Sequence, residues 1–484
     1  MNKKILLLSI PNIITNITIP LLGMVDLGLM GHLGSQVYIG AIALGTMIFN
    51  FIFWGFGFLR MGTSGFTAQA YGGRDLKEAA QVLVRSVVVG VSGGVLLILL
   101  QGPIAWLAFR LVDGSPEVEQ LAAQYFRIRV WAAPATLVMY ALTGWFIGMQ
   151  NARTPMILAI SVNLLNILFS LGFIHLAGMT SDGIALANVL SQCTAIVLSI
   201  FFLRGYYGKL KQHLNFREAL RWEAMKRFIS VNKDIFIRTL CLIFVLSFFT
   251  TQSASSGDTV LAVNTLLFQF FFFFSYFIDG FAYAAEALTG RYIGAGDKPA
   301  LRKAVRILFI WGSSLALVFT AIYGFGGKAL LQLLTDQPAI IDASLPYLFW
   351  IALIPLVTFS AFLWDGIYVG ATASAPMRNS MVVITVVIFL PAYYLLSGPL
   401  GNNGLWLAMM GFMFARGVFL SLLARKQIFG DLVTWSLGHL FTYLYLRKMS
   451  NFESERSWDL TVDPSQSAAI SGAKQAEGNT EQSL

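Results

Sequence analysis

Apolar stretches long enough to cross a membrane recur along most of the chain, and they constrain its fold more than any other feature. We find about twelve of them, near residues 6–31, 39–61, 84–110, 125–149, 155–177, 184–203, 231–251, 259–290, 304–333, 345–370, 377–397 and 404–424. A helix crosses a bilayer with about 20 such residues. Charged residues make up only 12% of the sequence, against about 25% in soluble domains. These features predict an all-α, multi-pass membrane protein with twelve transmembrane helices.

The distribution of lysine and arginine predicts how the helices are oriented. One set of loops contains the basic residues Lys3, Lys4, Arg74, Lys77, Arg85, Arg153, Arg204, Lys209, Lys211, Arg217, Arg221, Lys226, Arg227, Arg291, Lys298, Arg302, Lys303, Arg378, Arg425 and Lys426. The opposite loops have almost none, and only the segment 110–129 is mixed. Because basic loops stay in the cytoplasm, both termini are predicted to be cytoplasmic, in a plasma (inner) membrane. The net charge of +9 comes from these loops and does not indicate nucleic-acid binding.

The first apolar stretch contains an acidic residue, Asp26, which shares one helical face with Asn12, Asn16 and Gly23. Pro11 and Pro20 lie in the same stretch and are predicted to bend the helix. A carboxylate at membrane depth costs roughly 3 kcal/mol on insertion scales, so the setting favours proton binding. Asp26 is therefore a candidate proton-coupling residue. The alternative is a structural aspartate bonded to neighbouring hydroxyls. We interpret this stretch as a retained first helix, since it shows no cleavage site.

Polar residues inside two other helices of the first half predict a pocket. Asn163, Asn166 and Ser170 share one face of the fifth apolar stretch, and Asn188 and Gln192 lie four residues apart on the sixth. Together with Asp26 they would form a polar pocket within the first half, since intramembrane polar residues mark ion and substrate paths. The alternative for each residue is an interhelical hydrogen bond.

A second polar set occurs in the other half. Tyr276, Asp279, Tyr283 and Glu286 share one face of the eighth stretch. Asp365 on the tenth stretch lies at a similar distance from the cytoplasmic end as Glu286, and Arg291 is close to Glu286 in sequence. An Asp–Glu–Arg group of this kind is either a gate or second protonation site, or a structural ion network. The sequence leaves both interpretations open.

Signatures of enzymes and cofactor sites are absent from the sequence. There is no Gly-rich phosphate loop of the Walker type, and the four histidines do not cluster. Cys193 and Cys241 both lie in apolar stretches and indicate neither a disulfide nor a metal site. We therefore expect no enzyme activity, no metal site and no cofactor, with H+ or Na+ as the coupling ion.

The two halves of the chain repeat one another. Residues 66–75 align with 288–297, residues 144–148 with 366–370, and residues 183–187 with 404–408, at a nearly constant offset. Six helices per half predict parallel repeats. We expect an N-lobe at 1–204, a cytoplasmic linker at 205–230 and a C-lobe at 231–425. Residues 426–484 are predicted to be a cytoplasmic tail, with an interfacial amphipathic helix first and a disordered polar segment after it.

Several motifs resemble those of the multidrug and toxic-compound extrusion (MATE) transporters. They are Pro11, PLLGMVD (20–26), GHLG (31–34) and AQAYG (68–72) in the first half. In the second half, DGFAYAAE (279–286), DGIYVGA (365–371) and MRNSM (377–381) resemble the DinF branch of that family. The resemblance covers about residues 5–425. It implies two pseudo-symmetric six-helix bundles arranged as a V around a central cleft, and efflux of organic, often cationic, compounds in exchange for H+ or Na+. It also implies that Asp26 is the coupling site, that the first helix bends at Pro11, and that Asn166 belongs to the pocket.

The chain departs from the family pattern on two helices. Where the family usually has Asn-x-x-x-Asp on the fifth helix, this chain has Asn166 and Ser170, and Asn188 replaces a common Thr on the sixth. One acidic group fewer weakens a Na+ site, which favours H+ coupling. Residual coupling through Glu286 or Asp365 is left open. We therefore expect a monomeric antiporter whose partners are amphipathic organic cations and membrane lipid.

Two other functions are weighed against antiport. The first is a flippase for a lipid-linked precursor, which needs a cleft rich in arginine and lysine to hold pyrophosphate. The bases of this chain are assigned above to cytoplasmic loops, which argues against it. The second is a membrane-embedded acyl or glycosyl transferase, which needs a clustered His or Asp dyad on an aqueous face. The sequence shows no such cluster.

Overall fold

A computed structural model describes residues 1–31, 36–111 and 115–430, and every regular element in those ranges is a helix. Within the ranges, the side chains of Ile19, Asp26, Leu27, Met30, Gln36, Ile39 and Leu111 are not described. Twelve spans in the described part are long and apolar enough to cross a membrane. The prediction of an all-α protein with twelve membrane helices is confirmed.

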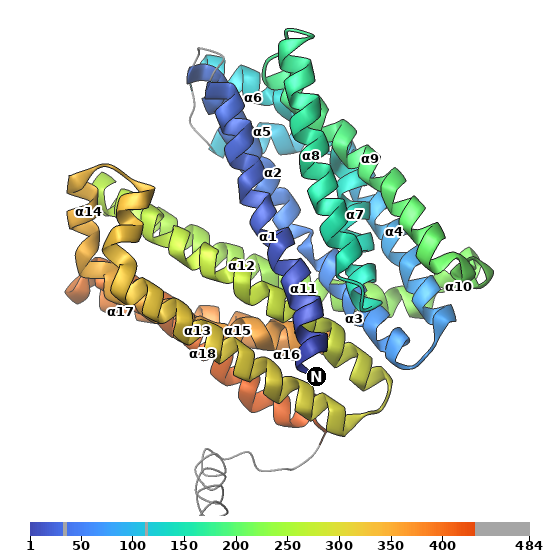
Figure 1. Ribbon diagram of the computed structural model, residues 1–484. Helices are drawn as coiled ribbons and strands as arrows, with labels where there is room; N and C mark the ends of the chain where they lie inside the picture. Colours follow the sequence, from blue (N-terminus) through green and yellow to red (C-terminus); the bar gives the residue numbers. More distant parts are fainter. Residues whose placement is uncertain (32–35, 112–114, 431–484) are drawn as a thin grey trace, which may run out of the picture. The chain divides into compact units, whose positions relative to one another are not determined.

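The first bundle ends at Tyr207, three residues into the predicted linker 205–230, and its helices can be followed in Figure 1. It consists of α1 (Asn2–Gly31), α2 (Gln36–Gly55), α3 (Gly57–Gly72), α4 (Leu76–Leu99), α5 (Gln101–Leu111), α6 (Pro116–Arg129), η1 (Val130–Ala132), α7 (Ala133–Gly148), α8 (Arg153–His175) and α9 (Ser181–Tyr207). The pair α2 and α3 forms one span, interrupted only at Phe56, and α6 to α7 form another.

The second bundle repeats this plan. It consists of α11 (Trp222–Ser255), α12 (Asp258–Gly294), α13 (Lys298–Leu334), α14 (Pro338–Ser344), η3 (Leu345–Tyr347), α15 (Leu348–Gly370), α16 (Ser374–Val383), the π-helical turn η4 (Ile384–Phe389), α17 (Leu390–Leu400) and α18 (Asn402–Gln427). Between the bundles lie η2 (Gly208–His213) and α10 (Phe216–Ala219). The predicted interfacial and disordered parts of the tail, from residue 431 onward, lie outside the described residues.

Several helices are longer than the apolar stretches that predicted them. The second span continues to Gly72 instead of ending at residue 61, and α11 begins at Trp222 instead of residue 231. The third stretch, predicted as one helix, is two, because the chain breaks at Leu100 between α4 and α5. Hydropathy identifies only the part of a helix that lies in the hydrocarbon. A prediction from hydropathy therefore omits polar helix ends that continue into the interface.

Close backbone packing shows the repeat directly. A Cβ on Gly72 of α3 would overlap the carbonyl of Arg291 on α12, and a Cβ on Gly294 of α12 would overlap the carbonyl of Gln69 on α3. The two glycines are 222 residues apart, and each fits against the other bundle's helix. Only glycine permits this approach, because any side chain would collide with main-chain atoms. The two bundles are therefore joined here by a reciprocal, pseudo-symmetric contact.

The same offset relates unusual backbone conformations. Arg74 and Gly296 both have positive φ (57° and 68°), as do Gln150 and Thr372 (63° and 53°). Each pair ends equivalent helices in the two bundles. Positive φ is uncommon outside glycine, so its recurrence at matched positions identifies the bundles as copies of one plan. Gln150 also donates a hydrogen bond to the carbonyl of Ala287 on α12 (2.8 Å), which ties this turn to the other bundle.

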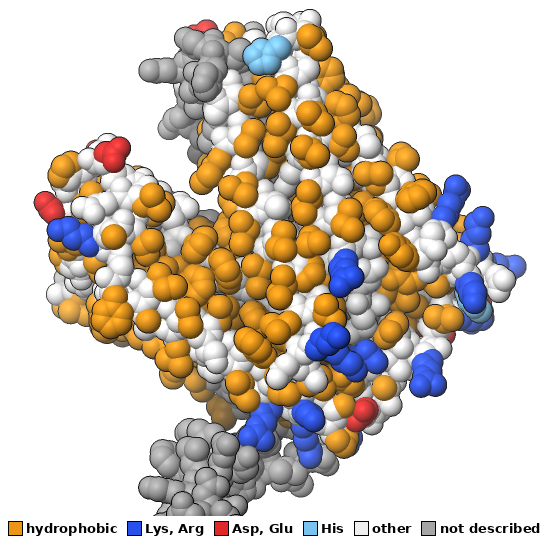
Figure 2. Space-filling view, in the orientation of Figure 1, with side chains coloured by type: hydrophobic (Ala, Val, Ile, Leu, Met, Phe, Trp, Pro, Cys, Tyr) orange, Lys and Arg blue, Asp and Glu red, His pale blue; other side chains and the backbone are white. Residues whose placement is uncertain are grey.

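The linker is fixed to the first bundle by polar contacts. The buried Arg85 of α4 donates to the carbonyl of Ala219 on α10 (2.8 Å), and Lys77 pairs with Glu218 (2.7 Å). Figure 2 shows most lysine and arginine side chains on this face gathered toward the lower and right-hand edge, which includes the region of α10. This asymmetry is the pattern from which the cytoplasmic side is predicted.

Candidate functional site

Helix α1 carries the predicted coupling residue. It runs as one continuous helix through Pro11 and Pro20, and the bends predicted there remain predictions. Asp26 lies near its C-terminal end, and the Asp26 side chain lies outside the described residues. Asn16, which shares its face, donates a hydrogen bond to the carbonyl of Tyr276 on α12 (3.1 Å). The face that carries Asp26 therefore also contacts the other bundle.

The predicted N-lobe pocket residues lie on α8 and α9, and α8 packs against both α1 and α9. Asn163 donates to the carbonyl of Thr18 on α1 (3.1 Å). Asn166 and Ser170 are fully buried, and their side-chain polar atoms have no hydrogen-bond partner among the described residues. A buried amide without partners costs about 1–3 kcal/mol. Such a group marks a place where a water molecule or ligand would be stabilised.

Asn188 and Gln192 on α9 are half-buried. Within the described part of the chain, neither side chain makes a hydrogen bond, although the Asn188 carbonyl accepts one from Ser191 (2.9 Å). They lie on the helix that packs against α8. The structure thus brings polar residues of α1, α8 and α9 onto neighbouring helices, as the sequence predicted, while their role in a pocket remains a prediction.

In the second bundle, the buried Asp365 of α15 binds two arginines. Its Oδ2 accepts hydrogen bonds from Arg238 of α11 and from Arg416 of α18, the latter at 2.6 Å. All three residues are buried, and the Nε atoms of both arginines and Oδ1 of Asp365 have no partner in the described residues. One carboxylate therefore holds three helices together and leaves a positive charge partly uncompensated.

A second ion pair joins the two bundles. Arg60 of α3 lies 3.4 Å from the buried carboxylate of Glu286 on α12, and its guanidinium group stacks over the Tyr283 ring at 4.0 Å. Asp279, two turns before Glu286 on α12, makes no ion pair within 4 Å among the described side chains, but it lies within electrostatic range of Arg60, Arg238 and Arg416. The polar face of α12 therefore lies between both charge clusters.

These contacts correct two interpretations of the sequence. Glu286 and Asp365 do not share Arg291. Glu286 pairs with Arg60, Asp365 pairs with Arg238 and Arg416, and Arg291 stacks on Tyr71 and Tyr292 instead. The bases are also not confined to cytoplasmic loops. Membrane spans also contain wholly or partly buried arginines, among them Arg60, Arg129, Arg238 and Arg416. These arginines lie within apolar segments of the sequence and not in the loops from which the orientation was predicted. The segments are those near 39–61, 125–149, 231–251 and 404–424.

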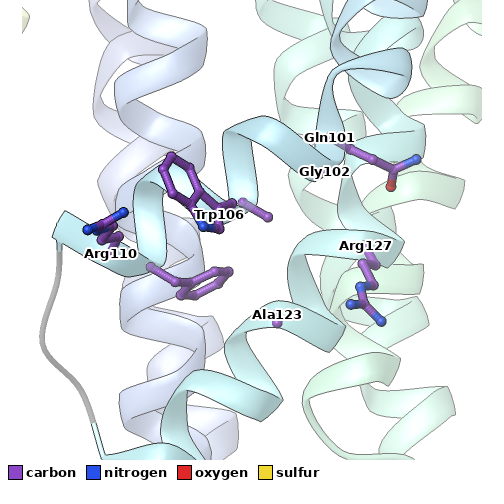
Figure 3. A pocket seen from close by; sticks show the side chains of 8 residues that line it. Gln101, Gly102, Trp106, Arg110, Ala123 and Arg127 are labelled. Atoms are coloured by element: carbon purple, nitrogen blue, oxygen red, sulfur yellow. The ribbon is translucent and has the colours of Figure 1, made fainter.

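The described part also contains cavities away from these clusters. A cavity of about 640 Å³ lies between α5 and α6, where Figure 3 shows Trp106, Arg110 and Arg127 around it. Another, of about 530 Å³, is lined by Pro11 together with Leu7, Ile10 and Arg153. Pro11 is thus the one predicted site residue that lines either of these two cavities.

Two helical bundles built as parallel repeats, with ionisable groups buried inside their membrane spans, define a membrane transporter. Comparison with known proteins agrees. The family model MatE matches residues 11–171 and 236–395. DNA damage-inducible protein F of Escherichia coli is 36% identical over 434 residues, with 88% of this chain and 92% of that protein covered. Multidrug and toxin extrusion protein 1 of Danio rerio is 23% identical, with 87% and 72% covered.

Solved structures share the fold. One is the outward-facing conformation of a multidrug resistance MATE family transporter of the MOP superfamily. It matches with a TM-score of 0.79 at 22% identity, covering 89% of this chain and 97% of that one. The chain belongs to the MATE family of transporters and to its DinF branch, as the motifs predicted. It is a multi-pass membrane protein with two pseudo-symmetric bundles.

Proposed function

We propose that this protein exports amphipathic organic cations across the plasma (inner) membrane in exchange for protons, by alternating access. The observation that carries the proposal is that α1, the helix of Asp26, packs against α8, which carries the buried and unpartnered Asn166 and Ser170. Family membership supports transport, and the names of the relatives supply drugs and toxins as the substrate class.

The proposed cycle depends on one proton. An ionised Asp26 attracts a cationic substrate, and protonation from the outside removes that attraction, so that the substrate leaves outward. Moving one charge across 100 mV releases about 2.3 kcal/mol, before any pH gradient is added. Ser170 in place of a second acid supports H+ over Na+, because a Na+ site needs oxygen ligands with negative charge.

A second candidate, the flippase, regains support from the arginines buried within the spans. Among Arg60, Arg129, Arg238 and Arg416, three have acidic partners: Arg60 pairs with Glu286, and Arg238 and Arg416 pair with Asp365. A pyrophosphate carries at least two negative charges and needs several uncompensated bases. Within this group of four, only Arg129 has no acidic partner among the described side chains. Antiport of small amphipathic compounds therefore fits these charges better.

The experiment is transport of a cationic dye by purified protein in proteoliposomes under an imposed H+ or Na+ gradient. We expect a proton gradient to drive transport by the wild type and by Asp258→Asn, a matched change at an exposed helix end. Asp26→Asn should abolish it. Ser170→Asp should increase the response to Na+. Proton-driven transport by Asp26→Asn at the wild-type rate would refute the proposed role.

A further inference from the structure

We infer that the transported compounds carry an anionic group besides their cationic one, and that Arg129 binds it. This inference rests on the proposed function and deepens it. It follows from an arginine within the candidate membrane span Pro116–Gly148, just before its most apolar part, with no acidic partner among the described residues. A charge in such a position is costly and marks a functional site, with a partner to be named.

The surroundings of Arg129 hold its guanidinium group in place without neutralising it. Nη1 donates hydrogen bonds to the hydroxyl of Tyr125 (2.6 Å) and to Oγ1 of Thr46 on α2 (3.2 Å). The group also lies over the rings of Phe49 (4.9 Å) and Tyr125 (5.5 Å). Hydroxyls and rings position a cation, but they leave its net charge intact.

The free edge of this guanidinium group has the geometry of a carboxylate site. Nε is buried without a hydrogen-bond partner, and Nη2 bonds to none of the described residues. Nε and Nη2 form the fork by which arginine binds a carboxylate or a phosphate with two parallel hydrogen bonds. The atoms that recognise an anion are therefore the ones that the protein leaves unused.

The neighbouring charges direct an anion to Arg129 rather than to the other buried arginines. Arg60, Arg238 and Arg416 face Glu286, Asp365 and Asp279, three bases against three acids. The acidic group of an amphipathic zwitterion would bind Arg129. Its cationic group would remain the one whose binding competes with the proton.

Two dyes that differ in one group test this inference. Rhodamine B carries a cationic xanthene and a free carboxylate, and rhodamine B ethyl ester keeps the cation and masks the carboxylate. Binding of each to the purified full-length protein in lipid nanodiscs is measured by fluorescence anisotropy. We expect the wild type to bind rhodamine B about tenfold more tightly than the ester, the ratio typical of one added charge-assisted hydrogen-bonded pair.

Variants assign that preference to Arg129. Arg129→Gln should weaken rhodamine B binding about tenfold and leave the ester unchanged, and Arg129→Lys should restore part of the preference. Arg127→Gln, a matched change at an exposed residue two positions away on α6, should alter neither. Equal affinity of the wild type for both dyes would overturn the inference. It would also be overturned if Arg129→Gln lost the same affinity for both dyes while Arg129→Lys bound both as tightly as the wild type. In either case, proton-driven transport of the ester by the wild type would leave the proposed function standing.

Discussion

Replacing Asp365 by asparagine should strongly destabilise the second bundle. The substitution keeps the shape of the side chain but removes the charge that Arg238 and Arg416 share in a buried position. Breaking a buried ion pair by removing one partner costs about 3–5 kcal/mol. The charge of Asp279 acts on both arginines and offsets part of the loss. We therefore expect a decrease of about 3 kcal/mol in the free energy of unfolding, the lower end of that range.

The assay is reversible unfolding in mixed micelles, followed by tryptophan fluorescence, with Asp258→Asn as the control at an exposed position. The triple variant Asp365→Leu, Arg238→Met, Arg416→Met should recover most of the lost stability, because apolar replacement of a buried charge cluster is often neutral. An Asp365→Asn protein within about 0.5 kcal/mol of wild type, the range of ordinary surface changes, would refute the view that this cluster holds the bundle together.

Two further perturbations probe the contact between the bundles. Gly72→Leu should disrupt the packing of α3 on α12 at a cost of about 1–3 kcal/mol. The measurement is the rate of thiol labelling of a cysteine introduced at Ala68, which should increase. Gly411→Leu, at a position where a Cβ meets nothing within 4 Å, should leave the labelling rate unchanged. Glu286→Gln should leave Arg60 uncompensated between the bundles and lower stability by about 1–3 kcal/mol; unchanged melting in this variant would argue that the pair contributes nothing.

Much of the fold follows from the sequence because the membrane restricts it. Unsatisfied backbone groups are so costly in hydrocarbon that apolar stretches must be helices, and the glycine motifs around Gly72 and Gly294 already indicated the repeat. The ends of the helices were harder to predict from the sequence. Hydropathy marks the apolar part of a helix and not its ends, so it did not indicate the start of α11 at Trp222 or the break at Leu100.

The site was only partly predictable. The positions of Asn166 and Ser170 on a buried face followed from helical periodicity, and the structure places them on α8 against α1 and α9. The ion-pair partners of Asp365 could not be predicted from helical periodicity, because Arg238 and Arg416 belong to helices far away in sequence. Long-range ion pairs depend on how the helices rotate against each other, which periodicity within one helix does not determine.

The most direct test of the account counts protons. A pulse of cationic dye is added to proteoliposomes of weak buffer capacity that contain the protein, and proton movement is recorded with a pH electrode alongside dye transport. The account predicts that protons move opposite to the dye in the wild type, and that both movements are lost together in Asp26→Asn. Dye transport without counter-movement of protons, or proton-coupled transport that persists in Asp26→Asn, would contradict it.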